Sequence, residues 1–485
     1  MNPDYALLFR ALRPETHLVV GALLVLFFDM IWARHRPANR HHVAMALGLL
    51  ALVSAAGQAI ADRSFGPVFG GALLIDTLTV ATRVGVIGLA ALTLALLPAR
   101  LRNPAEFTAI VLFATVGFTL MAAANQLLIV FLALELASLS LYVLAGFDQT
   151  RPASAEAGLK YYLVGGMSAA FILFGFSLLY GLTGSISLGQ ISDQLALQGQ
   201  SPLLIVALVM VLVAFGYKAA AAPFHLWAPD VYEGAPAPAA ALIASASKLA
   251  GLVLFTRLLW SGAAAATGTI AHVPVTVGWT PVVALIALAS LLIGNLGALA
   301  QSNVRRLLAY SAIAHAGALL LGVIAAGRTG AGPLFYYAAT YGLATVGAFG
   351  VISALESVGP AQKLTDLAGL YRRSPLLAGC LAIFVLSLAG IPPLAGFFGK
   401  FAVFASVLRL GGLGGPVGWL VILAIALSAV ALYYYLLILK QALVAAPAKD
   451  APAVKVMPAT AVALAVAAAL LVVLGAAPSL ILQWF

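Results

Sequence analysis

Apolar runs of about 20 residues recur along the whole chain, and each is long enough to cross a membrane as a helix. The pattern predicts an all-α polytopic membrane protein of about fourteen transmembrane helices. A β-barrel would show short segments of alternating polarity, and these runs do not alternate. The spans are expected to begin near residues 17, 43, 77, 107, 127, 157, 203, 239, 281, 307, 334, 376, 419 and 458.

Two of these spans combine prolines with a lysine. The stretch Phe215–Pro238 carries Lys218 before Pro223, and the stretch 386–401 carries Lys400 after Pro392. Irregular backbone inside a membrane is tolerated where it lines a cavity rather than lipid. A charged residue beside a helix break is costly to build and is typical of a functional site.

The positions of the two broken spans predict an internal symmetry. Spans four to eight (107–260) and spans nine to thirteen (280–440) each contain a broken helix as their fourth member. Because five is an odd number, the second unit has the opposite orientation in the membrane, as in inverted-repeat transporters. Helices one to three (1–106) precede the repeats and helix fourteen (457–485) follows them. No linker divides residues 1–485, so we predict one membrane domain.

The composition supports a membrane protein. Of 485 residues, 63% are hydrophobic and only 8% are charged, with a mean hydropathy of +1.09. Asp29 lies within the first apolar run, so this run is interpreted as a retained helix rather than a cleavable signal. The single cysteine, Cys380, excludes an intrachain disulfide and a cysteine-held cluster.

The net charge of +10 comes from short loops between spans, which argues against nucleic-acid binding. Loops after odd-numbered spans are much richer in lysine and arginine than the others. This bias predicts that these loops are cytoplasmic and that both termini are periplasmic. The loops expected in the cytoplasm hold Arg34, Arg36, Arg40, Arg100, Arg102, Arg151, Arg305, Arg306, Lys363, Arg372, Arg373, Lys449 and Lys455, against Arg10, Arg13, Arg63 and Arg328 on the other side.

Glu135 is the one acidic residue in the middle of the fifth span. Ser138 and Tyr142 follow it on the same face of the helix. One interpretation is a structural carboxylate that is protonated or hydrogen-bonded. The other is a charged group paired with a lysine on a neighbouring helix.

Lys218, Lys248 and Lys400 each lie well inside an apolar span. Lysines near helix ends extend to the membrane interface, but these three lie too deep for that. Lysine can release its proton in a low-dielectric site, whereas arginine never does so in proteins. At an effective dielectric near 20, a carboxylate at ~4 Å stabilises a lysine charge by roughly 4 kcal/mol, and moving it to ~10 Å removes more than half of this. Separating Glu135 from Lys218 would therefore favour proton release.

Two histidines and a fourth lysine extend the set of candidates. His225 follows the first break, and His315 lies in the tenth span one turn after Ser311. Either could relay protons near neutral pH, and either could be a satisfied core histidine. No two histidines share a span, which argues against haem. Lys160 follows Glu156 by one turn, so it is either an ordinary surface pair or the mouth of a cytoplasmic inlet.

Two other polar groups have weaker signals. Tyr337, Tyr341 and Thr345 follow one another at helical spacing in the eleventh span and could support a water chain or pack as aromatics. Asp230 and Glu233 are expected to be solvated in a cytoplasmic loop.

These features together resemble the antiporter-like, proton-pumping membrane subunits of respiratory complex I (NADH-quinone oxidoreductase), which are related to subunits of multisubunit sodium/proton antiporters. The resemblance covers nearly the whole chain. Its most specific pieces are Glu135, Lys218 with the following Pro-Phe-His-Leu-Trp, Lys248, and the second break with Lys400. Lysine at position 400, and a chain that ends after the fourteenth span, resemble subunit N most among the three large members.

The resemblance implies a role for each buried group in moving protons from the cytoplasm to the periplasm. Glu135 and Lys218 would form a coupling ion pair. Lys248, with His315 nearby, would pass the proton along a hydrated axis, and Lys400 would deliver it toward the periplasm.

The resemblance also implies that Lys160 and His225 serve the cytoplasmic approach. The energy would come from NADH oxidation and quinone reduction in other subunits of a translocase. No cofactor or metal is therefore expected in this chain, and FMN, iron–sulfur clusters and quinone would belong to partner subunits. The expected partners are lipids, the neighbouring antiporter-like subunit M and small subunits such as K, in a bacterial inner membrane.

Other functions use similar residues. A subunit of a multisubunit sodium/proton antiporter would share most of them, although a line of lysines offers no oxygen cage for sodium. A passive scaffold subunit with vestigial charges is a second alternative, and a subunit of a membrane-bound hydrogenase is a third. The sequence has no Walker loop for ATP chemistry, so the driving energy must come from elsewhere.

Overall fold

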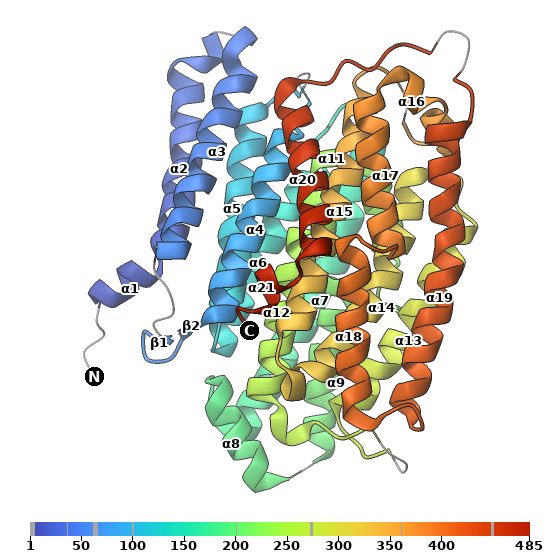
Figure 1. Ribbon diagram of the computed structural model, residues 1–485. Helices are drawn as coiled ribbons and strands as arrows, with labels where there is room; N and C mark the ends of the chain where they lie inside the picture. The colour runs from blue at the N-terminus through green and yellow to red at the C-terminus, as the bar shows by residue number, and fades with distance from the viewer. Residues whose placement is uncertain are drawn as a thin grey trace.

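The computed structural model describes residues 5–35, 37–61, 66–98, 101–199, 201–271, 275–359, 361–447 and 451–485. Within these ranges the chain forms a bundle of long helices that run roughly side by side (Figure 1). Thirteen helical segments of the described residues are long and apolar enough to cross a membrane. A further predicted span is divided into two shorter helices, α17 (Pro375–Ala389) and α18 (Ala395–Gly411). The predicted polytopic helical fold is confirmed.

The N-terminal part contains three spans and a short hairpin, and Figure 1 shows α2 and α3 at one edge of the bundle. The hairpin was not predicted from the sequence, because its strands are only three residues long and carry no clear pattern. Its turn is possible because Gly70 and Gly71 adopt positive φ angles. The elements are α1 (Tyr5–Ala11), α2 (Arg13–Ile31), α3 (Pro37–Ala61), β1 (Gly66–Val68), β2 (Leu73–Ile75) and α4 (Thr77–Ala95).

The next group of helices covers the first predicted repeat. Prolines at the first turns of α5, α7 and α9 start these helices where their missing N–H groups cost nothing. The helices are α5 (Pro104–Ala123), α6 (Leu127–Ala145), α7 (Pro152–Thr183), α8 (Leu188–Gln198), α9 (Pro202–Ala219), α10 (Trp227–Gly234), α11 (Ala237–Ala244) and α12 (Ala246–Arg257).

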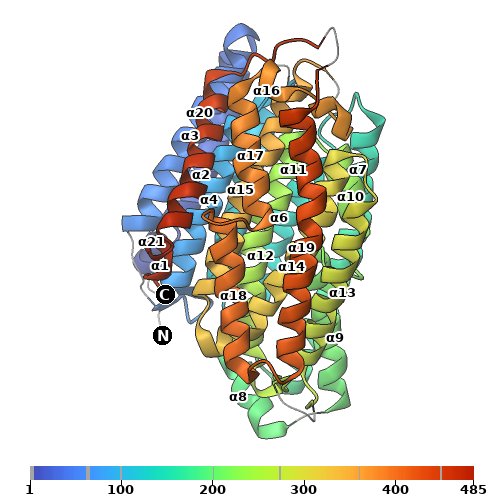
Figure 2. The ribbon, with the colours of Figure 1, turned by 45° about the vertical axis from the view of Figure 1, so that its right-hand side comes forward.

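The remaining helices cover the second predicted repeat and the last span. Figure 2 shows α17 and α18 one above the other, as two halves of one crossing. Besides α17 and α18, the helices are α13 (Trp279–Leu299), α14 (Val304–Thr329), α15 (Gly332–Glu356), α16 (Leu370–Arg373), α19 (Pro416–Leu439), α20 (Pro458–Ala476) and α21 (Ser479–Leu482).

Two arginines join the N-terminal helices to the bundle. Arg83 on α4 forms a buried ion pair of 2.8 Å with Glu15 on α2, and Arg257 on α12 pairs at 2.9 Å with Asp76, the N-cap of α4. Burial alone would raise the pKa of Asp76, but the Arg257 charge and hydrogen bonds from Arg257 and Thr79 hold that pKa below its ordinary value. Arg83 and Glu15 are both buried, and removing one member of a buried pair leaves an uncompensated charge, so this pair fixes α4 against α2.

The first helix break follows α9. Ala220 adopts a left-handed conformation with φ 55°, and its N–H donates to the Tyr217 carbonyl at 2.9 Å. The next N–H, that of Ala221, donates to the Gly216 carbonyl at 2.8 Å. The left-handed residue turns the chain out of the helix, so the carbonyls of the last turn face the interior of the bundle rather than a continuing helix.

The second break, after α17, repeats this backbone pattern. Gly390 has φ 84° and donates to the carbonyls of Leu386 and Ser387, each at 3.0 Å. The N–H of Ile391 then donates to Leu386 at 3.1 Å. The matching patterns favour the predicted pair of five-span units, whose inverted symmetry stays a prediction.

Aligning the two left-handed residues gives a register between the breaks. Lys400 lies ten residues after Gly390, and the residue ten positions after Ala220 is Asp230. In this register Lys218 aligns with Leu388, so the second break has no lysine at that position. Lys400 aligns with the acidic Asp230. The two lysines occupy different places in their units, as their positions before and after the prolines indicated.

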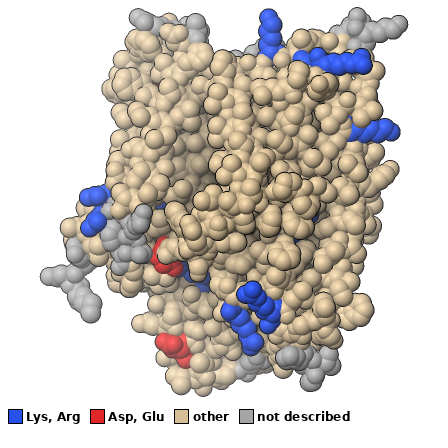
Figure 3. Space-filling view, in the orientation of Figure 1, with Lys and Arg blue, Asp and Glu red and all other residues tan. Residues whose placement is uncertain are grey.

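Charged side chains are scarce on the surface. Most of the face drawn in Figure 3 is uncharged, and its few charged groups lie mainly near the ends of helices. An uncharged belt of this kind is expected where helices contact lipid. Of the basic loop residues used to predict orientation, Arg36, Arg63, Arg100 and Lys449 lie outside the described residues.

Candidate functional site

Lys218 lies in the last turn of α9, directly before the first break, and is buried. Its ammonium donates to the hydroxyl of Ser138 on α6 at 3.2 Å. Glu135 lies three residues earlier on α6 and interacts with Lys218 through its charge. These two described side chains do not form a direct ion pair. Ser138 therefore lies at the contact that the sequence analysis expected Glu135 to make.

A cavity of about 20 Å³ lies between α6, α7 and α9, and Glu135, Ser138 and Lys218 all line it. One water molecule needs roughly 10–15 Å³. The cavity therefore has room for about one water that could connect the carboxylate to the ammonium. Tyr142, Ser168 and Tyr217 complete its polar lining.

Lys248 lies three residues after a kink that the sequence analysis missed. Ser245 separates α11 from α12, and its hydroxyl donates to the Ala241 carbonyl at 2.6 Å. A serine hydroxyl that bonds back by four residues often bends a helix. The kinked span leaves Lys248 buried, with its ammonium bonded to the Ala312 carbonyl at 2.6 Å. The ring centre of Tyr341 lies 5.2 Å from the same ammonium.

The stem of Lys218 packs against α12, the helix that carries Lys248. A methyl group placed on Gly251 of α12 would lie 3.2 Å from the Lys218 Cγ atom. Gly251 is one turn beyond Lys248, so the stem of Lys218 lies against the helix that carries Lys248. The two lysines follow one another across the bundle.

His315 on α14 is buried and makes hydrogen bonds with both ring nitrogens. Its Nδ1 atom lies 2.6 Å from the hydroxyl of Tyr337, and its Nε2 atom lies 3.1 Å from that of Tyr435. Tyr435 is in turn hydrogen-bonded to Ser311. Each hydroxyl can donate or accept, so this chain of groups can pass a proton in either direction. His315 also lies within electrostatic range of both Lys248 and Lys400.

Lys400 lies on α18 beside the end of α17. Its ammonium donates to the carbonyls of Leu388 and Ala389, each at 3.1 Å. These carbonyls form the negative end of the α17 dipole, which stabilises a positive charge. A second cavity of about 20 Å³ is lined by both His315 and Lys400, and it also has room for about one water.

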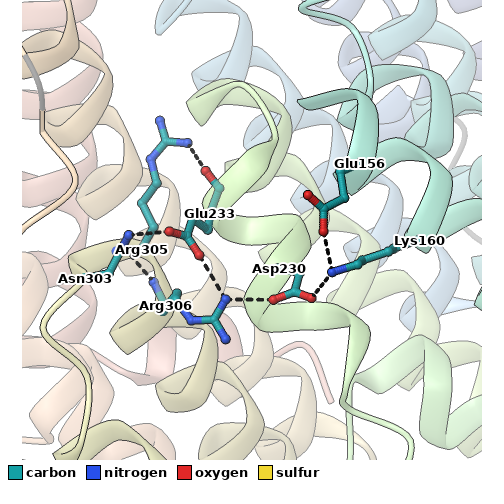
Figure 4. A network of polar contacts seen from close by, with 7 residues as sticks. All are labelled: Glu156, Lys160, Asp230, Glu233, Asn303, Arg305 and Arg306. Atoms are coloured by element: carbon teal, nitrogen blue, oxygen red, sulfur yellow. Dashed lines mark hydrogen bonds and ion pairs between the residues drawn. The ribbon is translucent and has the colours of Figure 1, made fainter. Parts of the chain in front are cut away.

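Lys160 belongs to a separate network of charges at one end of the bundle (Figure 4). It forms ion pairs with Glu156 at 2.7 Å and with Asp230 at 2.6 Å. Arg306 on α14 bridges Asp230 and Glu233 at 2.7 and 2.9 Å. Lys160 thus makes the predicted pair within α7, and it also contacts α10.

The expectation that Asp230 and Glu233 are merely solvated is wrong. Both carboxylates are about one-third exposed and pair with Arg306, and Asn303 donates to Glu233 at 2.8 Å. Arg305 donates to the carbonyls of Glu233 and Ala235, which end α10. The network therefore holds α10, the second half of the broken span, between α7 and α14.

Breaking the Lys160–Asp230 pair is expected to cost little energy by itself. We expect a double-mutant cycle with Lys160→Gln and Asp230→Asn to give a coupling of roughly 0.2–1 kcal/mol, since the partners are 43% and 31% exposed. Thermal unfolding of the purified protein at low and high salt measures it. The coupling should shrink at high salt. A coupling that does not depend on salt would contradict the view that this is a screened, half-exposed pair.

Two of the predicted site residues, His225 and Lys160, do not contact the other five. His225 is buried beside the first break, and its Nδ1 atom has no hydrogen-bond partner within the described part of the chain. Lys160 contacts α10 but not the buried lysines. The residues brought together are Glu135, Lys218, Lys248, His315 and Lys400. In the described residues, no group of three or more His, Cys, Asp or Glu side chains is arranged to hold a metal.

Several proteins are similar to this chain. Residues 124–432, which contain all seven candidate residues, match the model of the family described as NADH:quinone oxidoreductase/Mrp antiporter, transmembrane. A protein of Acidobacterium capsulatum named NADH-quinone oxidoreductase subunit N 2 is 46% identical over 503 residues, covering all of both chains. A protein of Roseiflexus castenholzii with the same name is 42% identical over 437 residues, covering 86% of this chain and 84% of the relative.

Solved structures share the fold. A chain of respiratory complex I from Thermus thermophilus matches with a TM-score of 0.79 and 33% identity, over 97% of this chain and 98% of that one. A chain of the Mrp complex from a Dietzia species matches with a TM-score of 0.81, over 98% of this chain and 96% of that one. Its identity is only 20%, so this second likeness shows the fold alone.

Proposed function

Because the chain belongs to the NADH:quinone oxidoreductase/Mrp antiporter family of membrane subunits, we propose that it is the proton-translocating subunit N of a bacterial NADH-quinone oxidoreductase. Full-length relatives carry that name, and a chain of respiratory complex I has this fold. In this proposal the chain moves protons, while FMN, iron–sulfur clusters and quinone belong to partner subunits. Neighbouring membrane subunits, including M and K, would surround it.

The observation that carries the proposal is the line of ionisable groups inside the spans of the bundle. Glu135, Lys218, Lys248, His315 and Lys400 lie on five different helices, in that order. Ser138 and a small cavity connect Glu135 to Lys218, and the stem of Lys218 packs on the helix of Lys248. Lys248 bonds to a carbonyl on the helix of His315, and a second small cavity connects His315 to Lys400. Ionisable groups are expensive inside a membrane. Four of these five are buried and Glu135 is half-buried, which favours a role in proton transfer over a purely structural one.

The first two members act as a switch in this proposal. The negative charge of Glu135 stabilises the protonated form of Lys218, and Ser138 accepts a hydrogen bond from its ammonium. All three side chains line a cavity with room for about one water. Neutralising Glu135, or moving it away, removes that stabilisation, and the proton of Lys218 passes to Lys248. How quinone reduction in partner subunits drives that change is outside this chain.

The last two members deliver the proton. His315 accepts it next to Lys248 and passes it through the shared cavity to Lys400, whose charge is stabilised by the carbonyl end of α17. Lys160 and His225 would serve uptake from the cytoplasm. Lys160 on α7 pairs with Asp230 on α10, and His225 lies at the first break.

The orientation follows the basic side chains. Arg373 ends α16 and Lys455 precedes α20. In Figure 1, α16 and the start of α20 lie at the upper end of the bundle, and this end would face the cytoplasm. The first and last helices, α1 and α21, both lie in the lower half of that view, which supports periplasmic termini. The membrane would be the bacterial inner membrane.

Sodium transport is the main alternative, and ion dependence separates the two. We expect NADH-driven acidification of inverted membrane vesicles to be equal with and without sodium, because lysine ammonium groups repel a sodium ion and provide no oxygen ligands. Acidification that requires sodium, or sodium uptake in step with NADH oxidation, would favour an antiporter subunit.

Tyr435 is a further relay residue in this proposal. Tyr435→Phe removes the hydroxyl that joins His315 to Ser311 without changing the packing of the ring. We expect proton pumping to fall roughly two- to tenfold, because one hydrogen bond is worth about 0.5–1.5 kcal/mol. Pumping by vesicles measures this. Tyr433→Phe, an exposed neighbour on the same helix, is the matched control. Equal rates in both variants would remove Tyr435 from the relay.

A further inference from the structure

A cavity of about 410 Å³ lies at the end of the bundle proposed to face the cytoplasm. It is enclosed by the end of α4, the loop between α6 and α7, the start of α11, the end of α15 and the segment before α20. None of the candidate proton-transfer residues lines it. Its volume falls within the range of about 300–1,000 Å³ that is common for small-ligand sites.

The cavity combines an apolar wall with a charged rim. Most of the wall consists of aliphatic side chains and prolines, among them Leu96, Leu101 and Val456. The charged groups at the cavity are Asp148, Arg151, Glu356 and Lys455. A ligand that fits must therefore have both an apolar part and a charged part.

The negative groups at this rim already have partners. Asp148 accepts hydrogen bonds from the N–H and hydroxyl of Thr150 at 3.2 and 2.6 Å. Glu356 forms an ion pair with Arg305. Each carboxylate is thereby engaged within this chain.

The positive groups have no partner among the residues that the structure describes. Within the described residues, the side chains of Arg151 and Lys455 make no hydrogen bond or ion pair. Arg151 also lies close enough to Arg305 for their like charges to repel. The groups left available at the cavity are therefore cationic donors, which suit an anion.

Backbone groups add to the positive potential. α7, α11 and α20 begin at this cavity, and their N-caps, Arg151, Pro236 and Met457, make no side-chain capping hydrogen bond. The carbonyls of Ala95 and Leu96, by contrast, accept hydrogen bonds from Thr460 and Ser353. The positive ends of three helices thus remain uncapped by side chains where the two basic side chains stand.

We propose that this cavity binds the headgroup of an anionic membrane phospholipid. Arg151 and Lys455 would hold its phosphate, and the aliphatic wall would contact its glycerol and first acyl carbons. Two observations favour a lipid over free phosphate: the apolar wall, and the position at helix ends, where headgroups lie. The site shares no residue with the proton-transfer line, so a test of lipid binding here is independent of a test of proton translocation.

The test counts phospholipid retained by the purified, assembled complex. We expect Arg151→Gln with Lys455→Gln to lose one tightly held phospholipid in native mass spectrometry, with affinity reduced at least about tenfold by two lost charged contacts. Arg372→Gln, which removes an exposed cation on α16 that does not line the cavity, should retain it. Ala354→Phe fills the cavity without changing charge and should cause the same loss.

Wild-type protein gives a second readout that needs no variant. A photoreactive phosphatidylglycerol in phosphatidylcholine vesicles is expected to label the segment 451–460. Unchanged lipid counts in the double variant or in Ala354→Phe, or absence of label from that segment, would overturn the proposal. Heat protection by inorganic phosphate that the double variant loses, with its lipid count unchanged, would identify a free-anion site instead. A segment of a neighbouring subunit occupying the cavity would also exclude the lipid.

Discussion

Replacing Lys400 with arginine is expected to lower proton translocation at least about tenfold while the complex still assembles. Arginine keeps the positive charge and can still donate to the Leu388 and Ala389 carbonyls. It cannot release a proton in a protein, however. Positioned proton-transfer groups commonly contribute roughly 10²–10⁴-fold, so blocking one that is obligatory should have a large effect. NADH-driven acidification of inverted vesicles, normalised to assembled complex, measures it.

Lys440→Arg is the matched control for this substitution. Lys440 is an exposed lysine that follows α19, outside the line of buried groups. It should tolerate arginine without loss of pumping. Full pumping by Lys400→Arg would show that the proton does not pass through Lys400, and that its charge has a structural role.

The second large effect is expected at Gly396, where α18 passes the end of α17. A methyl group on Gly396 would lie 1.8 Å from the Ser387 carbonyl oxygen, far closer than atoms can approach. The N–H of Gly396 also donates to the Ser387 hydroxyl at 3.1 Å. Gly396→Ala must therefore push the two half-helices apart. We expect it to cost about 3 kcal/mol and to displace Lys400, one turn further along α18.

Gly379→Ala provides the control on α17. No atom lies within 4 Å of a methyl group placed there, and alanine is about 1 kcal/mol better than glycine inside a helix. Thermal unfolding of the purified complex compares the two variants. Unfolding of Gly396→Ala at the wild-type temperature would show that the contact between α17 and α18 is not as tight as the structure has it.

The spans could be predicted from the sequence because lipid imposes a simple condition. A helix must present about 20 apolar residues to cross the membrane, and this chain meets the condition repeatedly. Start signals were also clear. α4 begins at Thr77 directly after its N-cap Asp76, and α17 begins at Pro375, one residue from the predicted start. The hairpin between α3 and α4 and the amphipathic helix α8 were not predicted, since neither is a long apolar run.

The ionisable groups inside the spans could be found because such groups are rare in apolar spans. Glu135, Lys218, Lys248, His315 and Lys400 were all identified on this ground, and the structure places them beside one another. The sequence does not show which polar side chain a buried lysine contacts on a neighbouring helix. Ser138 lies between Glu135 and Lys218, but its hydroxyl was assigned only to the same helix face.

Tertiary contacts decided the rest. Tyr435 lies in the apolar run of α19 beside two other tyrosines, Tyr433 and Tyr434, and nothing in that run shows which hydroxyl faces His315. The kink at Ser245 depends on which carbonyl its hydroxyl meets. Asp230 looked like a loop residue because its partners lie on helices that are distant in sequence.

The most direct test of the central claim is proton translocation measured together with NADH–quinone turnover in membranes that carry Lys218→Ala. Assembly is checked on a native gel. An assembled complex with strongly reduced pumping and turnover is the predicted result, because Lys218 links Glu135 to the rest of the line. Unchanged pumping in an assembled complex would contradict the account and would leave the broken helix as architecture in a scaffold subunit.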